Sequence, residues 1–261
     1  AREVMRELYR PLFLNETPIL FTTRRTSELI KYAANAFLAV KITFINEMAD
    51  LCEALGANVQ EVSRGIGLDG RIGRKFLNAG PGYGGSCFPK DTLALTKTAN
   101  DAGSPVRIVD TVVEVNAARK KAMAQKIIKA MGGDVKGKTI GVLGLAFKQN
   151  TDDMRDAPSL DILPALIDAG ATVRAYDPES MEEAAKLLTG ITYAESPYEA
   201  IDGADCMVII TEWDSFRALD LDRVKTLLTT PTVVDLRNIY DPTDMVERGF
   251  EYSSIGRDRG K

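Results

Sequence analysis

One short segment holds the residues that could carry out covalent chemistry. Residues 80–91 read GPGYGGSCFPKD, so a run of glycines leads to Cys87, Lys90 and Asp91. Glycines let a backbone approach a ligand closely, and the N–H groups of such a turn can bind an anion. A thiol at the start of a helix and near a lysine should be a reactive nucleophile. Residue chemistry alone leaves a second reading equally open, in which this segment is a structural turn with a buried cysteine.

The composition narrows the chemistry that this segment can perform. The 261 residues include three cysteines and no histidine. A Ser-His or Cys-His pair is therefore excluded, and without histidine or a CxxC pair we expect no metal site. Proton transfer must use Lys, Asp, Glu, Tyr or water. The odd, scattered cysteines predict free thiols and a reducing, cytoplasmic location.

A second set of polar residues interrupts a long apolar segment. Lys31 and Asn35 are four positions apart, and Asn46 follows after eleven more, so the three share one face of a helix. Buried polar groups need hydrogen-bond partners. For Asn46 the simpler reading is a hydrogen bond between helices.

The elements that must position these residues change type near residue 133. Before it, long segments without Gly or Pro predict helices over about 27–55, 58–66, 91–103 and 105–133. Thr26 or Ser27 offers an N-cap for the first of these, and Gly56 ends it. The first ten residues, AREVMRELYR, also have a helical pattern.

After residue 133, short apolar runs alternate with amphipathic segments. The runs predict strands at 139–147, 172–178, 191–194, 206–213 and 232–238, with helices between them. This alternation predicts a Rossmann-like, doubly wound parallel sheet. The expected fold class is therefore α/β, with an all-helical domain over residues 1–133 that carries the cysteine loop and an α/β domain over 134–261.

The long helix also predicts a partner. Its apolar residues, from Leu29 to Leu51, cover more than one face, so we expect a homodimer that buries the second face. The net charge of −4 argues against a nucleic-acid partner. No apolar run reaches the roughly 18 residues that span a bilayer, so no membrane partner is expected.

The chemistry-bearing segment resembles that of a known family. GPGYGGSCFPKD, preceded by RIGRKFL, is similar to the nucleophile loop of the UDP-glucose/GDP-mannose dehydrogenase family, above all of members that oxidise UDP-glucose. ELIKYAANAFLAVKITFINE resembles the central helix of that family, and the resemblance continues through GLAFKQNTDDMRDAPS. It implies an NAD-dependent, four-electron oxidation of UDP-glucose to UDP-glucuronate, through a thiohemiacetal and a thioester on a cysteine.

The resemblance implies a role for each matching residue. Cys87 would be the nucleophile, and Lys31 would stabilise negative charge on the C6 oxygen. Asn35 and Asp91 would hold a water or hydroxyl, with Asp91 as the base. The substrate positions implied are Arg71, Phe76, Leu77, Tyr83, Gly84, Phe147 and Lys148, of which Arg71 would reach the substrate of a neighbouring subunit. Lys90 and Arg155 would lie near the cofactor, and Arg237 is a weaker match.

Two features depart from the family pattern. Asn78 stands where some members have a lysine beside the phosphates. Gly141 and Gly144 do not complete a GxGxxG dinucleotide fingerprint. The resemblance therefore implies that the α/β domain binds the UDP group and that the main NAD-binding domain lies outside this chain, which lacks a starting Met. We expect such a fragment to be inactive alone.

Two other functions stay open at this point. The chain could belong to a dehydrogenase of another nucleotide sugar, such as GDP-mannose or a UDP-N-acetylhexosamine, because a few contacts decide base and hexose selectivity. It could also be a non-catalytic module that binds a sugar nucleotide or mediates assembly.

Overall fold

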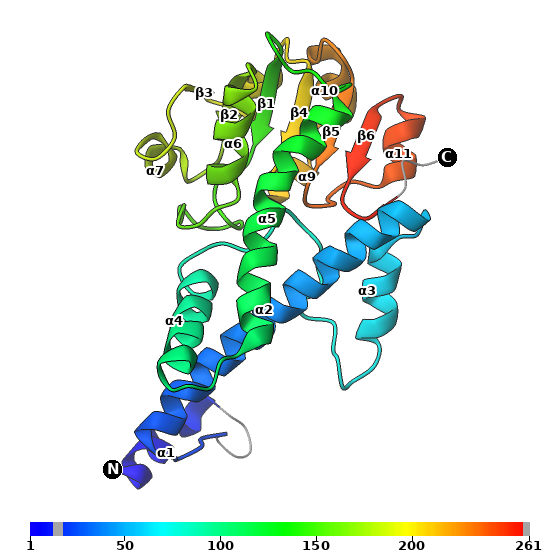
Figure 1. The fold of residues 1–261 in the computed structure, drawn as a ribbon. Helices are drawn as coiled ribbons and strands as arrows, with labels where there is room; N and C mark the ends of the chain where they lie inside the picture. The colour runs from blue at the N-terminus through cyan, green and yellow to red at the C-terminus, as the bar shows by residue number, and fades with distance from the viewer. Residues whose placement is uncertain (13–17, 258–261) are drawn as a thin grey trace.

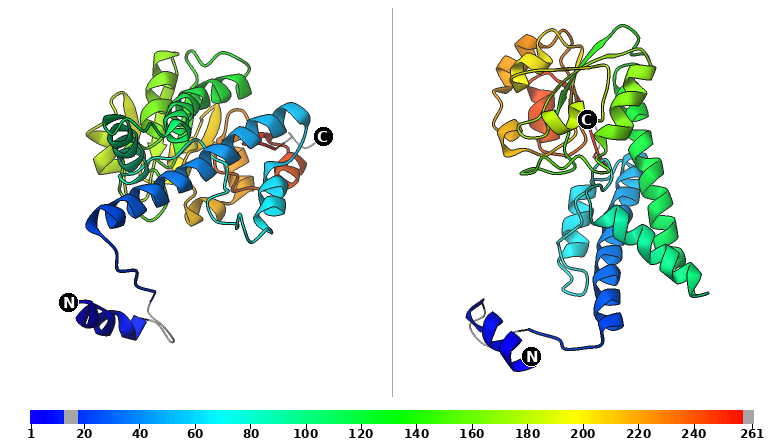
Figure 2. Two further views of the ribbon diagram at one scale, coloured as in Figure 1. Left: turned by 60° about the horizontal axis from the view of Figure 1, so that its bottom comes forward. Right: turned by 90° about the vertical axis from the view of Figure 1, so that its left-hand side faces the viewer.

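The computed structural model describes residues 1–12 and 18–257, and it places a helical region against one end of a parallel sheet (Figure 1). The helical region contains α1 (Arg2–Tyr9), the 3-10 turn η1 (Arg10–Leu12), α2 (Arg24–Leu55), α3 (Val59–Gly67), α4 (Phe88–Asp101) and α5 (Arg107–Ala130). Helix α1 lies apart from the rest of the molecule, near the start of α2 (Figure 2).

The long helix α2 begins earlier than predicted. Its N-cap is Thr23, whose hydroxyl accepts the N–H of Thr26 at 3.2 Å, so the predicted cap at Thr26 or Ser27 is wrong. Capping by the earlier threonine lets Arg24 and Arg25 join the first turn. The predicted end is confirmed, because Gly56 adopts the left-handed conformation at φ 69°.

Helix α4 also begins earlier than predicted, at Phe88 rather than Asp91. Pro89 lies in its first turn, where the missing N–H of a proline costs nothing. Cys87 therefore occupies the N-cap position. Helix α4 packs beside α2, and α5 lies against both (Figure 1).

The sheet is parallel throughout and has the order β3-β2-β1-β4-β5-β6. Its strands are β1 (Thr139–Leu143), β2 (Thr172–Tyr176), β3 (Ile191–Tyr193), β4 (Cys206–Ile209), β5 (Thr232–Asp235) and β6 (Glu251–Ser254). The strands are shorter than predicted, since the ends of the apolar runs fold into loops, and β6 was not predicted. The order reverses between β1 and β4, which makes this the topological switch point.

Helices cover both faces of the sheet (Figure 2). They are α6 (Ser159–Asp168), α7 (Met181–Ala185), α8 (Pro197–Ile201), α9 (Asp214–Arg217), α10 (Leu221–Leu227) and α11 (Pro242–Glu247). Residues of α5 and α6 form one core on the sheet, and residues of α8, α10 and α11 form a second core on its other face. The predicted α/β class with a long helix is confirmed. Residues 258–261 of the predicted α/β domain lie outside the described residues.

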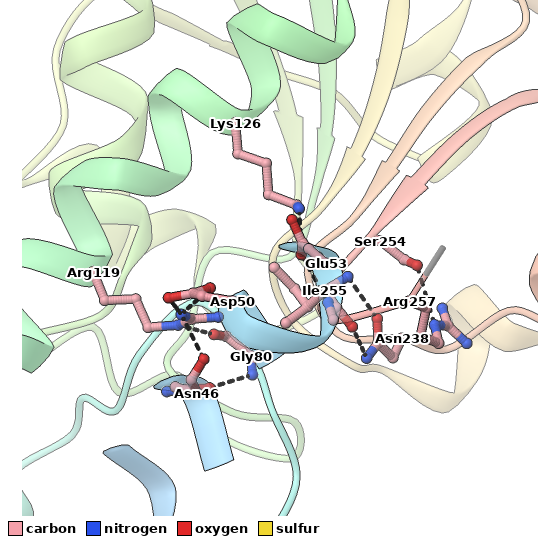
Figure 3. Close-up of polar contacts among 11 residues, drawn as sticks. Asn46, Asp50, Glu53, Gly80, Arg119, Lys126, Asn238, Ser254, Ile255 and Arg257 are labelled. Atoms are coloured by element: carbon pink, nitrogen blue, oxygen red, sulfur yellow. Dashed lines mark hydrogen bonds and ion pairs between the residues drawn. The ribbon is translucent and has the colours of Figure 1, made fainter. Parts of the chain in front are cut away.

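The end of the described chain returns to the helical region (Figure 3). The N–H of Gly256 donates to Glu53 Oε1 at 2.8 Å, and its carbonyl accepts the N–H of Val59 at 2.7 Å. Glu53 also pairs with Lys126 of α5 at 2.7 Å. These contacts tie the last strand of the sheet to the α2–α3 corner. In the described part of the chain, no helix has the length and apolar character needed to cross a membrane.

Candidate functional site

A cavity of about 430 Å³ lies where the glycine-rich loop faces the carboxyl end of the sheet. This is the switch point between β1 and β4, where parallel α/β sheets bind ligands. From the sheet it is lined by Phe147 and Lys148 after β1, Glu212 after β4 and Arg237 after β5. The helical side contributes Ile42, Asn46, Lys75, Phe76, Asn78, Gly80, Gly82, Tyr83, Gly84 and Phe88.

A second cavity of about 450 Å³ borders the first and shares Asn78, Glu212 and Arg237 with it. It adds Arg64, Arg74 and Arg217, together with neutral residues of α3 and the loop after it. The two cavities together make a groove between the two regions of the molecule, with an excess of arginine at one end.

The loop that leads to Cys87 has no room for side chains at Gly84 and Gly85. A Cβ atom at Gly84 would lie 2.3 Å from the carbonyl oxygen of Asp156. A Cβ at Gly85, where φ is 81°, would lie 2.7 Å from the ring of Phe147. The glycines therefore let the loop press directly against the segment that follows β1.

Cys87 is the exposed cysteine of the three, whereas Cys52 and Cys206 are buried. Burial raises the pKa of both buried thiols, so they stay protonated and inert. The Cys87 sulfur lies 3.7 Å from the hydroxyl of Ser86. Cys87 occupies the N-cap position of α4.

The structure brings Asn35 and Asp91 together. The side-chain amide of Asn35 donates to Asp91 Oδ2 at 2.5 Å, and both residues are buried. Lys90 Nζ lies 3.4 Å from Asp91 Oδ1. Lys31 lies one turn before Asn35 and is exposed, and it makes no hydrogen bond or ion pair with the described residues.

Most of the predicted substrate residues line the cavity. Phe76, Tyr83, Gly84, Phe147 and Lys148 all contribute to its wall. The ammonium of Lys148 lies 5.3 Å from the centre of the Phe147 ring. The ring of Phe88 contacts those of Phe76 and Tyr83 edge-on, with both centroid distances 6.0 Å. These rings form an apolar wall beside the cations.

Leu77 lines the second cavity, whereas Arg71 lies outside both cavities. The Leu77 side chain is 2% exposed and points into the core, so only its backbone could face a ligand. Its carbonyl accepts the hydroxyl of Ser63 at 2.7 Å. The Arg71 side chain is 89% exposed, pairs with Asp69 and lies outside the cavity.

Arg155 also lies outside the cavity, but its backbone supports the cysteine loop. Its carbonyl accepts the N–H of Gly85 at 2.7 Å. Its guanidinium pairs with Asp153 at 2.8 Å. This hydrogen bond is the main reason that the pKa of Arg155 is raised, and Asp153 and Cys87 charges raise it further. The Arg155 side chain therefore stays cationic near Cys87.

Arg237 proves more central than its weak sequence match suggests. Its Nε donates to the carbonyl of Ile210 at 2.7 Å and lies 3.0 Å from Glu212 Oε2. Its Nη2 donates to the carbonyl of Phe147 at 2.9 Å. The fork of the guanidinium therefore joins the loops after β1 and β4, at the edge of both cavities. Sequence reasoning missed Glu212, although it follows an apolar strand at the carboxyl end of the sheet.

The segment after β1 departs from the dinucleotide-binding fingerprint. After β1, Gly144 is packed against Thr211, where a Cβ would lie 2.4 Å from the threonine Cβ. The next helix, α6, begins only at Ser159, so no helix N-terminus directly follows β1 to meet a pyrophosphate. The described residues also hold no cluster of three His, Cys, Asp or Glu side chains that could bind a metal.

Comparisons with known proteins find two parts of the chain that match one family. Residues 25–118 match the central domain of the UDP-glucose/GDP-mannose dehydrogenase family, and residues 141–242 match the UDP binding domain of the same family. The UDP-glucose 6-dehydrogenase of Rhizobium meliloti (strain 1021) is 66% identical over 257 residues. That alignment covers 98% of this chain and 59% of the relative, so the chain spans little more than half of the relative's length.

Solved structures show the same relationship. A UDP-glucose dehydrogenase from Pyrobaculum islandicum superposes with a TM-score of 0.84 at 34% identity, over 98% of this chain and 56% of that one. An NDP-N-acetyl-D-galactosaminuronic acid dehydrogenase from Methanosarcina mazei Go1 gives 0.85 at 27% identity, over the same shares of the two chains. With two domains matched in order and a relative at 66% identity, the resemblance of the cysteine loop is confirmed, and this chain belongs to the UDP-glucose/GDP-mannose dehydrogenase family.

Proposed function

We propose that this chain is the thiol-bearing and sugar-nucleotide-binding part of an NAD-dependent UDP-glucose 6-dehydrogenase, which oxidises UDP-glucose to UDP-glucuronate. The observation that carries the proposal is the cavity at the switch point, where the loop leading to Cys87 meets Phe147, Lys148 and Arg237. The cavity offers an apolar wall, cations for a diphosphate and backbone N–H groups of a glycine-rich loop. The 66% identity to a UDP-glucose 6-dehydrogenase favours this substrate.

Cys87 is the nucleophile of the proposed reaction. Its thiolate adds to the C6 aldehyde, forming a C–S bond and an oxyanion that becomes a thiohemiacetal when it takes a proton. Lys31 is the cation assigned to this oxygen. The side chain of Lys31 is exposed and free to turn toward a bound substrate, since no ion pair with the described residues holds it. NAD, when bound, would accept one hydride at a time, so the four-electron oxidation would consume two NAD molecules in turn.

Asn35 and Asp91 serve the hydrolysis of the thioester. Their hydrogen bond at 2.5 Å fixes the orientation of the carboxylate. Asp91 then holds a water and takes its proton as the water attacks the acyl carbon, and the C–S bond breaks to release the thiolate. Lys90 lies 3.4 Å from the same carboxylate and balances its charge.

The remaining predicted residues surround the substrate and the cofactor. Phe76, Tyr83, Gly84, Phe147 and Lys148 contact the sugar nucleotide, as does the backbone of Leu77. Arg71 reaches the substrate of a neighbouring subunit, which agrees with its exposure and its place outside the cavity. Lys90 and Arg155 face the cofactor. Because the segment after β1 departs from the dinucleotide-binding fingerprint, the main NAD site belongs to another part of the full-length protein, and the chain alone is inactive.

The proposal has two further parts. The chain divides into a helical domain at residues 1–133 and a UDP-sugar-binding domain at 134–261. The three unpaired thiols favour a reducing, cytoplasmic compartment.

The full-length protein is proposed to be a homodimer through α2. Phe37, Phe44 and Leu51 are spaced by seven residues and are 64%, 46% and 49% exposed, so they form an apolar stripe along the helix. Burial of these side chains against a second copy would stabilise the pair by about 25 cal/mol per Å² of apolar surface. Sedimentation at micromolar concentration should give a dimer, and Phe44→Glu should give a monomer. A monomeric wild type would refute this part.

Two measurements test the function. Titration calorimetry of this chain should detect weak binding of UDP-glucose and no binding of NAD. The full-length protein should reduce NAD with UDP-glucose, and less well or not at all with GDP-mannose and UDP-N-acetylhexosamines. A preference for one of those sugars would overturn the assignment of UDP-glucose as the substrate. Absence of any oxidation would favour a non-catalytic module.

A further inference from the structure

The backbone that leads to Cys87 is held by three buried polar side chains outside the reacting groups. Asn46 of α2 accepts the N–H of Gly80 at 2.9 Å, and Arg119 of α5 donates to the Gly80 carbonyl at 2.7 Å. Asn116, also on α5, accepts the N–H of Tyr83 at 2.9 Å and donates to its carbonyl at 3.0 Å. We infer that Asn46, Asn116 and Arg119 are positioning residues that set the place of the Cys87 thiol, an inference that rests on the proposed function.

Burial makes these contacts specific. The three side chains are 1%, 6% and 6% exposed. A buried amide or guanidinium that loses its partner costs more than the hydrogen bond was worth. Arg119 is fixed in turn by Asp50, at 2.9 Å, and by the carbonyl of Asn46, at 3.2 Å (Figure 3). The loop can therefore leave this position only by exposing or orphaning several polar groups at once.

Between these contacts, the loop backbone packs closely against α5. Gly82 has φ 119°, and a Cβ there would lie 2.8 Å from Lys120 Cγ and 3.0 Å from Asn116 Oδ1. The backbone is thus pressed onto α5 at the residue between the two hydrogen-bonded positions. Asn116 and Arg119 are three positions apart on α5, so one face of this helix holds both ends of the segment.

The hydrogen-bonded residues are close enough to Cys87 in the chain to determine where its thiol lies. Three residues lie between Tyr83 and Cys87, and among them the N–H of Gly85 donates to the Arg155 carbonyl at 2.7 Å. The ring of Tyr83 packs on that of Phe88, the first residue of α4, with centroids 6.0 Å apart. A shift of Tyr83 must therefore move the start of α4 and the sulfur that precedes it. A misplacement of about 1 Å can cost a hundredfold in rate.

Two variants of Asn46 separate the loss of a hydrogen-bond acceptor from a change of volume. Only its Oδ1 is hydrogen-bonded among the described residues, because its Nδ2 has no partner there. Asn46→Asp keeps the acceptor for Gly80 beside the cationic Arg119, whereas Asn46→Leu removes it at a similar volume. Asn116→Asp keeps the acceptor for the Tyr83 N–H and loses the donor to the Tyr83 carbonyl. Asn100→Asp, at an exposed position near the end of α4, is the matched control.

The first experiment needs only this chain. Hydrogen exchange of peptides covering residues 80–86 should be at least about tenfold faster in Asn116→Asp and Asn46→Leu than in the wild type, and unchanged in Asn100→Asp and Asn46→Asp. Exchange that is the same in all five proteins would overturn the inference, whatever the reaction of the full-length protein.

The second experiment uses the full-length protein. In Asn116→Asp and Asn46→Leu, kcat with UDP-glucose should fall by about a hundredfold, with a much smaller rise in KM, while Asn100→Asp keeps the wild-type kcat. A loss of thermal stability with unchanged kcat would show a merely structural role and overturn the inference. If the wild type itself oxidises no nucleotide sugar, the proposed function fails, while faster exchange in the first experiment would still establish the hold on the loop.

Discussion

The two loops that face each other across the cavity are held by different sets of side chains. On the sheet side, the carboxylate of Asp177 accepts the N–H groups of Leu145 and Ala146 at 2.7 and 3.2 Å. On the helical side, amides and a guanidinium bond both N–H and C=O groups of Gly80 and Tyr83. A carboxylate can only accept, whereas amides also donate. Both loops are held at N–H and C=O groups, but the sheet loop needs separate side chains for the two. The hydroxyls of Ser159 and Thr211 donate to the carbonyls of Leu145 and Ala146, both at 2.6 Å.

This difference separates two tasks. In the proposed function, the helical side presents the reacting groups, Cys87 and Asp91, after a backbone segment that the same two helices fix at both donors and acceptors. The sheet side presents the cations Lys148 and Arg237, to which the proposed function assigns the diphosphate. Variants on the helical side should therefore lower turnover, and variants on the sheet side should lower affinity or stability.

The largest effect is expected at the thiol. In the full-length protein, Cys87→Ser should lower the formation of UDP-glucuronate by about a thousandfold or more, because the hydroxyl is a far weaker nucleophile and leaving group. The affinity for UDP-glucose, measured by calorimetry, should stay within about twofold of the wild type. Equal losses of turnover and affinity would break the separation of tasks.

A large loss of stability is expected at Asp177. This fully buried carboxylate also accepts the indole N–H of Trp213 at 3.1 Å and the N–H groups of Glu179 and Ser180 at 3.0 Å. Asp177→Ala leaves these donors unpaired and should lower the free energy of unfolding by about 3 kcal/mol or more. Urea unfolding measures the change, with exposed Asp152→Ala as the control. A change no larger than the control's would show that the sheet loop is held by other contacts.

A moderate loss of affinity is expected at Arg237. Arg237→Lys keeps the charge and loses the fork that joins the Ile210 and Phe147 carbonyls. The dissociation constant for UDP-glucose should rise about tenfold, which corresponds to about 1.4 kcal/mol. Exposed Arg107→Lys on α5 should leave it unchanged. A fall in kcat with unchanged affinity would place Arg237 among the reacting groups and break the comparison.

The smallest effect is expected on the pH dependence of stability, through the carboxyl of Asp153. The hydrogen bond from Arg155 is the main cause that lowers the pKa of this carboxyl below its usual range. A lowered pKa adds stability above the unfolded value of about 3.9 and loses it as the pH falls through the folded value. Arg155 is largely exposed, so the contribution should be below about 1 kcal/mol. The stability difference between wild type and Asp153→Asn should shrink from pH 6 to pH 3, and a constant difference would contradict this.

The sequence predicts the parts of the fold that periodicity encodes. The alternation after residue 133 predicts the parallel sheet, because buried parallel strands are continuous apolar runs. This pattern does not predict strand β6, because its sequence EYSS, at an edge of the sheet, is mostly polar. The start of α2 also escapes, because Arg24 and Arg25 have no apolar pattern and only the Thr23 cap defines the end.

The candidate site is predictable where residue type and motif coincide, as in residues 80–91. Arg119 is not, because the run RKKAMAQKIIK reads as the cationic end of a helix. Its burial depends on the Gly80 carbonyl, 39 positions away, which no local pattern reports. Asn46 was expected to bond another helix, and its partner is instead the N–H of the same glycine.

The return of the chain end to α2 has a consequence for folding. The hydrogen bond between Gly256 and Glu53 joins residues 203 positions apart, and Ala49 and Val59 pack around the glycine. Contacts of such long range form late, since the intervening chain must already be ordered. During synthesis, the corner of α2 and α3 therefore stays uncovered until the last strand has left the ribosome. The helical region should then gain its final stability together with the sheet, in one cooperative step.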